Sequence, residues 1–212
     1  YYIKGAFLDA DKAFEVINGM RTVELRVLLK AINTLVLARA LAAHPAINVQ
    51  CSAVEGNENY TLRERLMYLG LPAPLFTIDL DTEMGRRISR HAFQRFFDCL
   101  EPAFGLQVTL GQVNTVVVCP ALTSHSELSD EALRQAGISL TTIRIAVGDE
   151  DPRGLLAHLM QAAELALEPE CPGFSRHFGQ PQAIDALYES TYVDVHRRYA
   201  ASRPRMQQML SP

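Results

Sequence analysis

The stretch Thr142-Ile143-Arg144-Ile145-Ala146-Val147-Gly148-Asp149-Glu150-Asp151-Pro152 contains a predicted strand followed directly by the start of a helix. Apolar side chains recur at positions 143, 145 and 147, which is the period of a β-strand. Asp151 is a favourable N-cap residue, and Pro152 is well suited to the first position of a helix. Leucines at positions 155, 156, 159 and 165 follow at helical spacing. A strand, a short turn and a helix are therefore predicted here.

The same patterns predict further elements on both sides of this stretch. Strands are expected at residues 47–53, 76–80 and 106–110, and the uniformly apolar residues 113–119 predict a short buried segment or a strand. Helices are expected at residues 62–69 and 87–100 and between Ser129 and Gly137. A long helix capped by Asp9 or Asp11 and stopped by His44-Pro45 precedes them, as two helices or as one helix bent near Gly19 or Thr22. Strands interspersed with helices over short connections predict an α/β chain of the α+β type. Its single twisted sheet should be mostly antiparallel and covered by helices.

The pattern changes at Pro169. Residues 169–173 resemble a linker, and residues 182–200 then predict a helix whose apolar face contains Ile184, Leu187, Tyr188, Tyr192, Val195 and Tyr199. We therefore expect one domain over residues 1–168, and a linker with an additional C-terminal helix over residues 169–212. This last helix either packs on its own domain or contacts a partner subunit.

Composition excludes several classes of function. With 48% hydrophobic and 21% charged residues the chain is typical of a globular protein, and a net charge of -4 provides no basic surface for nucleic acid. No apolar run is long enough to cross a membrane, so we expect a cytoplasmic protein. The histidines and cysteines lack the spacing of a metal site, and no P-loop, G-x-S-x-G or G-x-G-x-x-G motif is present. The four cysteines are expected to be reduced.

Several segments resemble the C-terminal domain of the Cys/Met metabolism family of pyridoxal-phosphate (PLP) enzymes. Residues 109–114, 119–125 and 142–151 parallel that family's S-L-G-G-x-E, H-P-A-x-M-T-H and L-I-R-L-S-V-G-x-E-D motifs. Residues 5–14 and 19–26 also parallel its first helix, and Asn33 matches the asparagine of its H-x-x-N-A motif. The resemblance covers about residues 5–167 and implies the small C-terminal domain of a fold-type I PLP enzyme.

The resemblance implies a substrate-binding role in sulfur amino-acid metabolism. In that family, Arg144 would hold the substrate α-carboxylate, beside Thr109 and the Gly111 backbone, during elimination or replacement at Cβ or Cγ (transsulfuration). The PLP-binding lysine lies in the preceding domain of the family, and none of the three lysines here, Lys4, Lys12 and Lys30, follows its S-x-T-K pattern. The chain is therefore expected not to bind PLP covalently and not to catalyse alone, so no catalytic, cofactor-binding or metal residue is assigned.

The expected partners follow from the same resemblance. They are a PLP-binding N-terminal domain, in the same or a separate chain, an amino-acid substrate, and further copies of the chain in a homo-oligomer. No nucleic acid or membrane is expected among them.

Simpler interpretations of these residues remain open on sequence alone. Arg144 could form an ion pair with Asp149 or Glu150, and Thr109 could be a β-branched strand residue. The chain also departs from the family motifs, at Lys30 for histidine, Thr109 for serine, Gln112 for glycine and Asn114 for glutamate. An alternative function is therefore a degenerate, non-catalytic interaction or oligomerisation module.

Overall fold

The computed structural model describes residues 7–80 and 82–203. The helices are α1 (Ala10–Ala42), α2 (Tyr60–Leu66), α3 (Arg90–Asp98), α4 (Asp130–Gln135), α5 (Pro152–Ala166) and α6 (Pro181–Ser202). The strands are β1 (Asn48–Gln50), β2 (Leu75–Asp79), β3 (Gly105–Leu106), β4 (Val116–Val118) and β5 (Ile143–Ala146), and they form one sheet in the order β1-β2-β5-β4-β3. Short 3-10 turns connect several of these elements.

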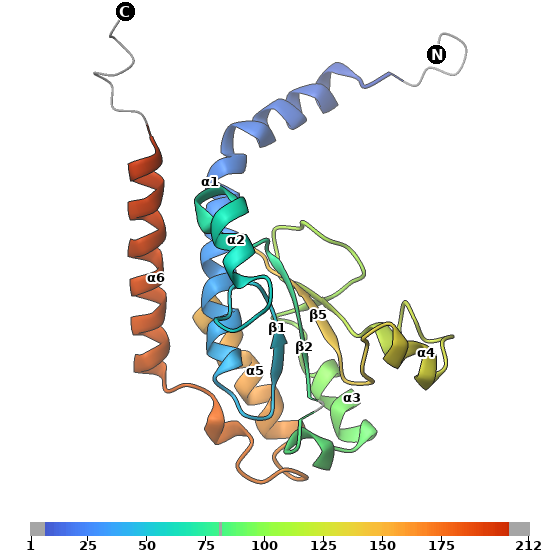
Figure 1. Cartoon of the computed structure of the whole chain (residues 1–212). Helices are drawn as coiled ribbons and strands as arrows, with labels where there is room; N and C mark the ends of the chain where they lie inside the picture. Colours follow the sequence, from blue (N-terminus) through green and yellow to red (C-terminus); the bar gives the residue numbers. More distant parts are fainter. Residues whose placement is uncertain (1–6, 81, 204–212) are drawn as a thin grey trace, which may run out of the picture.

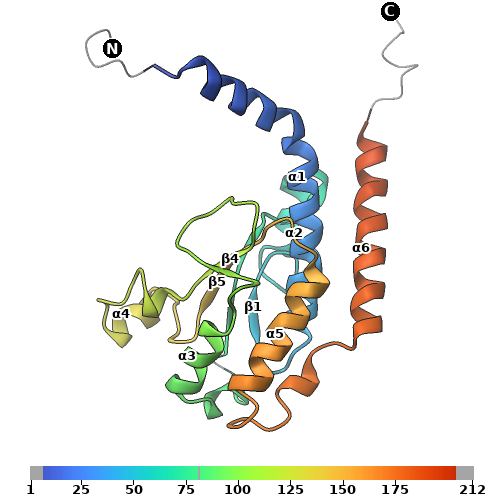
Figure 2. The same cartoon turned by 180° about the vertical axis from the view of Figure 1, so that it is seen from behind.

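The sheet is antiparallel at every junction except that between β3 and β4. β5 lies in the middle, between β2 and β4, and Ile143 and Ile145 are each only 1% exposed. Helices α1, α3 and α5 lie along one face of the sheet (Figures 1 and 2). Burying the isoleucines of β5 against these helices forms the core, since apolar area removed from water is the main stabilising term. The predicted fold class, a mostly antiparallel sheet covered by helices, is confirmed.

Helix α1 is one continuous helix that bends (Figures 1 and 2). Its N-cap is Asp9, whose carboxylate accepts a hydrogen bond from the Lys12 amide at 2.9 Å. The Gly19 carbonyl accepts a 2.7 Å hydrogen bond from the Arg26 guanidinium and a 3.4 Å one from the Thr22 hydroxyl. Such side-chain bonds to backbone carbonyls accompany bends in helices. The alternative of a single bent helix is therefore the one that the structure adopts.

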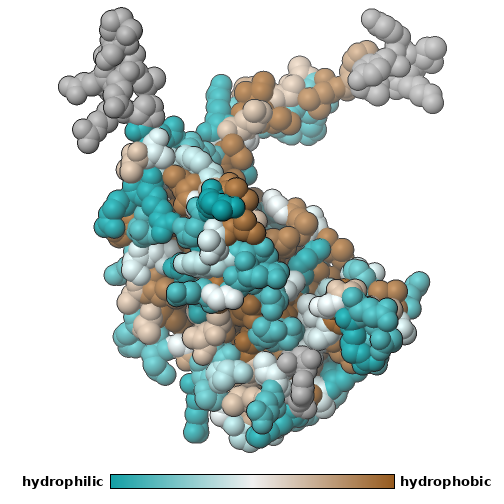
Figure 3. Space-filling view, in the orientation of Figure 1, coloured by the Kyte–Doolittle hydropathy of each residue, from teal (hydrophilic) through white to brown (hydrophobic). Residues whose placement is uncertain are grey.

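Burial divides α1 into two halves. Its buried residues begin only at Leu28, whereas the preceding half projects beyond the sheet (Figure 1). The exposed apolar side chains of that half are Phe14, Val16, Ile17, Met20, Val23, Leu25 and Val27. Figure 3 shows hydrophobic surface along this projecting part. We call it the apolar arm.

Two of the predicted strands are too long, and a third segment is a strand only in part. The strand predicted at residues 106–110 is wrong beyond Leu106, because β3 ends there and Val108 and Leu110 are 60% and 53% exposed. Similarly, β1 covers only part of residues 47–53, because a turn begins at Cys51, whose carbonyl accepts from the Val54 amide. The segment 113–119 contains only the three residues of β4. At 47–53 and 106–110 the alternation of apolar and polar residues continues into loops, where the residues pair with no neighbouring strand.

The helix predictions are closer to the structure. The one at residues 62–69 begins earlier, at Tyr60, and its last residues form a separate 3-10 turn. The one at 87–100 is capped by Ser89 instead of beginning at residue 87. Ser129 caps α4 as predicted, and Gly137 follows it with φ +71°. Positive φ at that position costs glycine little, since it has no Cβ.

Helix α6 packs on its own chain, against α1 and α5. Val195 and Thr191 are its buried residues, and Ile184, Leu187, Tyr188 and Tyr199 are half-buried against the core. Tyr192, predicted on the same face, is 41% exposed. In the described part of the chain, no helix is both long and apolar enough to cross a bilayer.

His44 fastens the segment that leads to α6. Its Nε2 lies 2.9 Å from the Phe174 carbonyl, and its Nδ1 accepts a 3.1 Å hydrogen bond from the Ala46 amide. The ring is 1% exposed and packs between Phe174 and Phe178, with centroids 4.5 Å and 4.8 Å away. Donation to one group and acceptance from the other require the neutral imidazole. Burial, together with the nearby His177, lowers the pKa of His44.

A pH dependence of stability follows from this lowered pKa. The folded protein binds fewer protons at His44 than the unfolded chain, whose histidine pKa is about 6.5. Stability from His44 is therefore present above about pH 6.5 and is lost as the pH falls toward the lower folded-state pKa. Urea unfolding between about pH 7 and pH 5 should show this loss, and a His44→Gln variant should show a smaller slope than wild type over the same range. Equal slopes would show that His44 titrates alike in the folded and unfolded states.

Candidate functional site

Arg144 lies at the centre of the sheet. On β5 it stands opposite Thr77 of β2 and Val118 of β4. Successive side chains of a strand point to opposite faces, so the core positions of Ile143 and Ile145 direct Arg144 away from the helices. The residue is half-buried. The predicted carboxylate-binding arginine is thus held on a rigid central strand.

Among the described residues, the hydrogen-bond partners of the Arg144 guanidinium are backbone oxygens. One terminal nitrogen, Nη2, donates to the carbonyls of Val108 and Thr109 at 3.2 Å and 3.4 Å. The Nε atom is buried and has no hydrogen-bond partner among the described residues. A buried donor without a partner costs about 1 to 3 kcal/mol, so Nε is an unsatisfied polar group within this site.

The alternative ion pair of Arg144 with Asp149 or Glu150 is not formed among the described residues. Asp149 instead lies 3.8 Å from the Lys30 ammonium. Glu150 accepts hydrogen bonds from the Thr115 amide and hydroxyl at 2.6 Å and 2.8 Å. Both carboxylates therefore have other neighbours, and the charge of Arg144 is left without a counterion in this part of the chain.

The loop after β3 brings Thr109 to Arg144 but not Gly111. Thr109 is half-buried and contacts the guanidinium through its carbonyl, not its hydroxyl. It lies outside any strand, so the interpretation as a strand residue is wrong. Gly111 is exposed and has φ +79°, and a Cβ there would meet no atom within 4 Å. Its glycine is therefore needed for the backbone turn and not for space.

Two departures from the family motifs contact each other. The Lys30 ammonium donates a hydrogen bond to the Gln112 carbonyl and lies 3.8 Å from the Asp149 carboxylate. The Lys30 side chain is 8% exposed. A buried ammonium needs such partners, because its desolvation is costly. Lys30 thus connects α1 to the loop that approaches Arg144.

A buried polar network joins α1, this loop and the turn after β5. The Asn33 amide donates to the carbonyls of Gly148 and Glu150 at 3.1 Å and 2.8 Å. The Gly148 amide donates to the Thr115 hydroxyl at 2.9 Å, and the Asp149 amide to the Val113 carbonyl at 2.7 Å. We call these contacts the turn network. Sequence reasoning named Asn33 only as a motif residue and did not find Thr115, which carries no motif signal.

The lysines do not fit a PLP site within the described residues. Lys12 is exposed and pairs with Glu15 at 3.0 Å on the surface of α1. Lys30 is committed to Gln112 and Asp149. Lys4 lies outside the described residues. Among the described residues, both lysines therefore have acidic or backbone partners within the domain.

Other candidate chemistry is weaker. No group of histidine, cysteine or acidic side chains in the described residues could hold a metal ion. His125, within the motif at 119–125, is exposed and contacts Ser124. All four cysteines are unpaired, and burial raises the pKa of the Cys51, Cys119 and Cys171 thiols. Raised pKa values keep these thiols protonated and unreactive.

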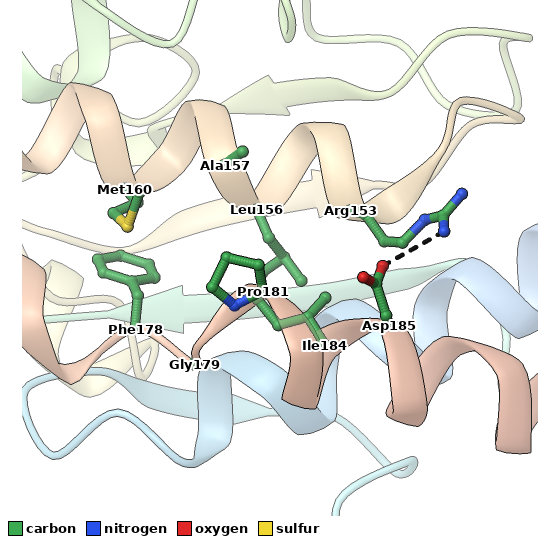
Figure 4. A pocket seen from close by; sticks show the side chains of 9 residues that line it. All are labelled: Arg153, Leu156, Ala157, Met160, Phe178, Gly179, Pro181, Ile184 and Asp185. Atoms are coloured by element: carbon green, nitrogen blue, oxygen red, sulfur yellow. Dashed lines mark hydrogen bonds and ion pairs between the residues drawn. The ribbon is translucent and has the colours of Figure 1, made fainter.

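A small apolar cavity lies between α5 and the start of α6, with a volume of about 100 Å³. Figure 4 shows Phe178, Pro181 and Ile184 facing Leu156 and Met160 across it. At its rim Arg153 pairs with Asp185 at 3.3 Å, so the only charged lining groups neutralise each other. The cavity reflects the packing of α6 on α5 and offers no catalytic group.

Comparison with known proteins matches this chain to one family. The model of the Cys/Met metabolism PLP-dependent enzymes matches residues 2–164. The L-methionine gamma-lyase of Pseudomonas deceptionensis is 32% identical over 161 residues, which are 76% of this chain and 38% of that protein. The homocysteine synthase of Schizosaccharomyces pombe is 29% identical over 72% of this chain and 34% of its own length. The chain thus spans little more than a third of these relatives.

Solved structures show the same partial correspondence. An O-acetylhomoserine (thiol)-lyase from Campylobacter jejuni, which contains a pyridoxyl-lysine phosphate, superposes with a TM-score of 0.64 and 28% identity. The alignment covers 76% of this chain and 36% of that one. The cystathionine gamma synthase of Xanthomonas oryzae, in complex with cystathionine, gives a TM-score of 0.60 and 26% identity, over 73% of this chain and 38% of that one. The fold matches the C-terminal part of fold-type I PLP enzymes.

Close packing in the turn network leads to a stability prediction. A Cβ on Gly148 would lie 2.3 Å from the Val113 carbonyl oxygen and 2.4 Å from the Asn114 carbonyl carbon. Gly148→Ala should therefore lower the free energy of unfolding by about 1 to 3 kcal/mol, because backbone must shift. Gly154→Ala is the matched control, since a Cβ there meets nothing within 4 Å and alanine favours the interior of α5. Urea unfolding measures both, and equal stability of the two variants would contradict the tight contact.

Proposed function

The chain belongs to the Cys/Met metabolism family of PLP-dependent enzymes, and we propose that it binds the substrate carboxylate in an enzyme of sulfur amino-acid metabolism. In this proposal, the reaction is an elimination or replacement at Cβ or Cγ of an amino acid, as in transsulfuration. The bound PLP supplies the electron sink for that chemistry. The residues described here orient the substrate.

The observation that carries the proposal is the state of Arg144. Its guanidinium is fixed by two loop carbonyls, has no carboxylate partner among the described residues, and retains a buried Nε–H without an acceptor. A planar guanidinium presents two parallel donors that match the two oxygens of a carboxylate. Holding the α-carboxylate fixes the orientation of the substrate, which lowers the entropic part of the barrier.

Thr109 and Gly111 contribute through the backbone in this proposal. The Thr109 carbonyl orients the Arg144 guanidinium, and the positive φ of Gly111 allows the backbone turn that follows in the same loop. The Lys30 ammonium and the turn network then hold the loop in place from α1. The loop is consequently a positioning element for Arg144.

PLP itself is proposed to be held by a separate domain, in the same or another chain. The described lysines are unsuited to bind it, and the relatives are nearly three times as long as the matched region. The apolar arm supports such a partner, because a contiguous exposed apolar surface is typical of an interface. Alone, the chain is proposed to be inactive, and the assembled enzyme is proposed to be a cytoplasmic homo-oligomer.

A second candidate is a non-catalytic interaction or oligomerisation module derived from this domain. The contact between Lys30 and Gln112 favours it, since both residues depart from the family motifs and lie beside the loop of Thr109. The exposed apolar arm would suit either function. Measuring turnover of an amino-acid substrate by the assembled protein therefore distinguishes the catalytic function from the non-catalytic one.

The purified chain alone should not form a stable covalent adduct with PLP. Mixing the purified chain with PLP and reducing with borohydride should leave no lysine labelled stoichiometrically, because no described lysine has the desolvated setting that activates an amine. Peptide mapping by mass spectrometry identifies the sites. The L-methionine gamma-lyase of Pseudomonas putida, a relative 30% identical over 159 residues, is the positive control. One fully labelled lysine in this chain would overturn the proposal that PLP is held elsewhere.

In the enzyme assembled with its PLP-binding domain, Arg144 should be required for efficient use of the substrate. Arg144→Lys should reduce kcat/KM about 30- to 700-fold, equivalent to about 2 to 4 kcal/mol, because an ammonium cannot reproduce the bidentate pair. Arg134→Lys, on the exposed surface of α4, is the matched control and should retain wild-type kinetics. Steady-state kinetics measure this effect, and an unchanged melting temperature of Arg144→Lys shows that the variant is folded. Wild-type kcat/KM in Arg144→Lys would reduce Arg144 to a structural residue, and no activity in the assembled wild-type protein would favour the non-catalytic module.

A further inference from the structure

Helices α1, α2 and α6 line a partly open polar cavity of about 230 Å³. Four of its lining residues come from α6, which follows the family-matched residues 2–164. A water molecule takes a share of about 30 Å³ in the liquid, so the cavity has room for a small polyatomic ion. It is separate from Arg144, which does not line it.

The charges around this cavity do not balance. Three guanidinium groups line it, from Arg39, Arg63 and Arg198, against two carboxylates, Glu64 and Asp194. At neutral pH the lining therefore carries one excess positive charge. The Arg63 side chain is only 3% exposed, which makes its charge costly without compensation.

Glu64 pairs with both Arg63 and Arg198, and Asp194 pairs with Arg198. Glu64 lies 2.7 Å from Arg63 and 3.6 Å from Arg198, and Asp194 lies 2.8 Å from Arg198. Arg63 also donates from Nε to the Ser52 carbonyl and from Nη1 to the Gly70 carbonyl. Each of its three nitrogens thus has a partner, and its positive charge lies at the cavity wall.

Arg39 is the lining arginine with which neither carboxylate pairs. In the described part of the chain it forms no ion pair, and its one hydrogen bond is a long one of 3.4 Å from Nε to the Ala53 carbonyl. It is half-buried in the last turn of α1 and lines the cavity opposite α6. Its two terminal NH₂ groups, which make no hydrogen bond to described residues, are free to bind an acceptor. Thr191 of α6, 5% exposed, adds a hydroxyl to the lining.

We propose that this cavity binds a small oxyanion, with Arg39 as its principal partner and Arg198 and Thr191 completing the site from α6. The guanidinium fork is suited to the paired oxygens of phosphate, sulfate or carboxylate, and the excess positive charge selects an anion. Bound between three helices, the ion fastens α6 to α1 and α2. Because it binds only the folded arrangement, it raises the stability of the chain with its concentration.

The test is isothermal titration of the whole chain with inorganic phosphate, sulfate and acetate at constant ionic strength. We expect saturable binding at one site per chain. The affinities for phosphate and sulfate, which are tetrahedral, should differ from the affinity for acetate, whose carboxylate is planar. Arg39→Gln should weaken binding about 10- to 100-fold, as expected for loss of charge-assisted hydrogen bonds. Arg134→Gln removes the same charge from the exposed surface of α4 and should leave the affinity unchanged.

A variant that is expected to bind the anion more tightly keeps the test independent of folding defects, because a folding defect would weaken binding. Asp194→Asn removes a half-exposed carboxylate from the rim and releases Arg198, so binding should tighten several-fold, whereas Asp98→Asn on α3 should have no effect. A rise of melting temperature with phosphate should follow the same order among the variants. The proposal is overturned by absence of saturable binding to any of the three anions, by wild-type affinity in folded Arg39→Gln, or by unchanged affinity in Asp194→Asn.

Discussion

The buried side-chain amide of Asn33 is the contact on which the site depends. It donates to two carbonyls of the turn after β5, those of Gly148 and Glu150, which lie more than a hundred residues away along the chain. Glu150 in turn accepts from Thr115 at the start of β4. Each partner satisfies a buried polar group that would otherwise be costly, so the network holds as a unit. Helix, loop and central strand therefore have one relative arrangement.

That arrangement leaves the guanidinium of Arg144 available. The acidic residues next to it in sequence are drawn away, Asp149 toward Lys30 and Glu150 toward Thr115, and the nearby loop offers carbonyls instead of carboxylates. Carbonyls orient a guanidinium without neutralising its charge. The same residues that stabilise the turn thus leave Arg144 without a counterion among the described residues, on the face of the sheet away from the helices.

The sequence predicted most of the helices and the central strand, because those signals are local. Capping residues such as Ser129 and Asp151 and the alternation in β5 need no knowledge of distant contacts. The strand predicted at 106–110 failed because Val108 and Leu110 alternate with polar residues while lying in an exposed loop. Arg144 was identified by a motif, but its loop contacts and the Lys30 to Gln112 bond depend on tertiary structure and left no sequence signal.

Helix α6 lies outside the residues that match the family model but packs against them. The family model ends at residue 164, yet α6 buries Val195 and Thr191 against α1 and α5, and His44 at the end of α1 binds the segment leading to it. A marginal amphipathic helix is stabilised by such packing. Where α6 crosses α1 and α2 the contact is polar, and arginines outnumber carboxylates there. Apolar side chains would have stabilised the same contact. The charge of Arg39, which has no counterion among the described residues, is therefore the feature of this contact that packing alone does not explain.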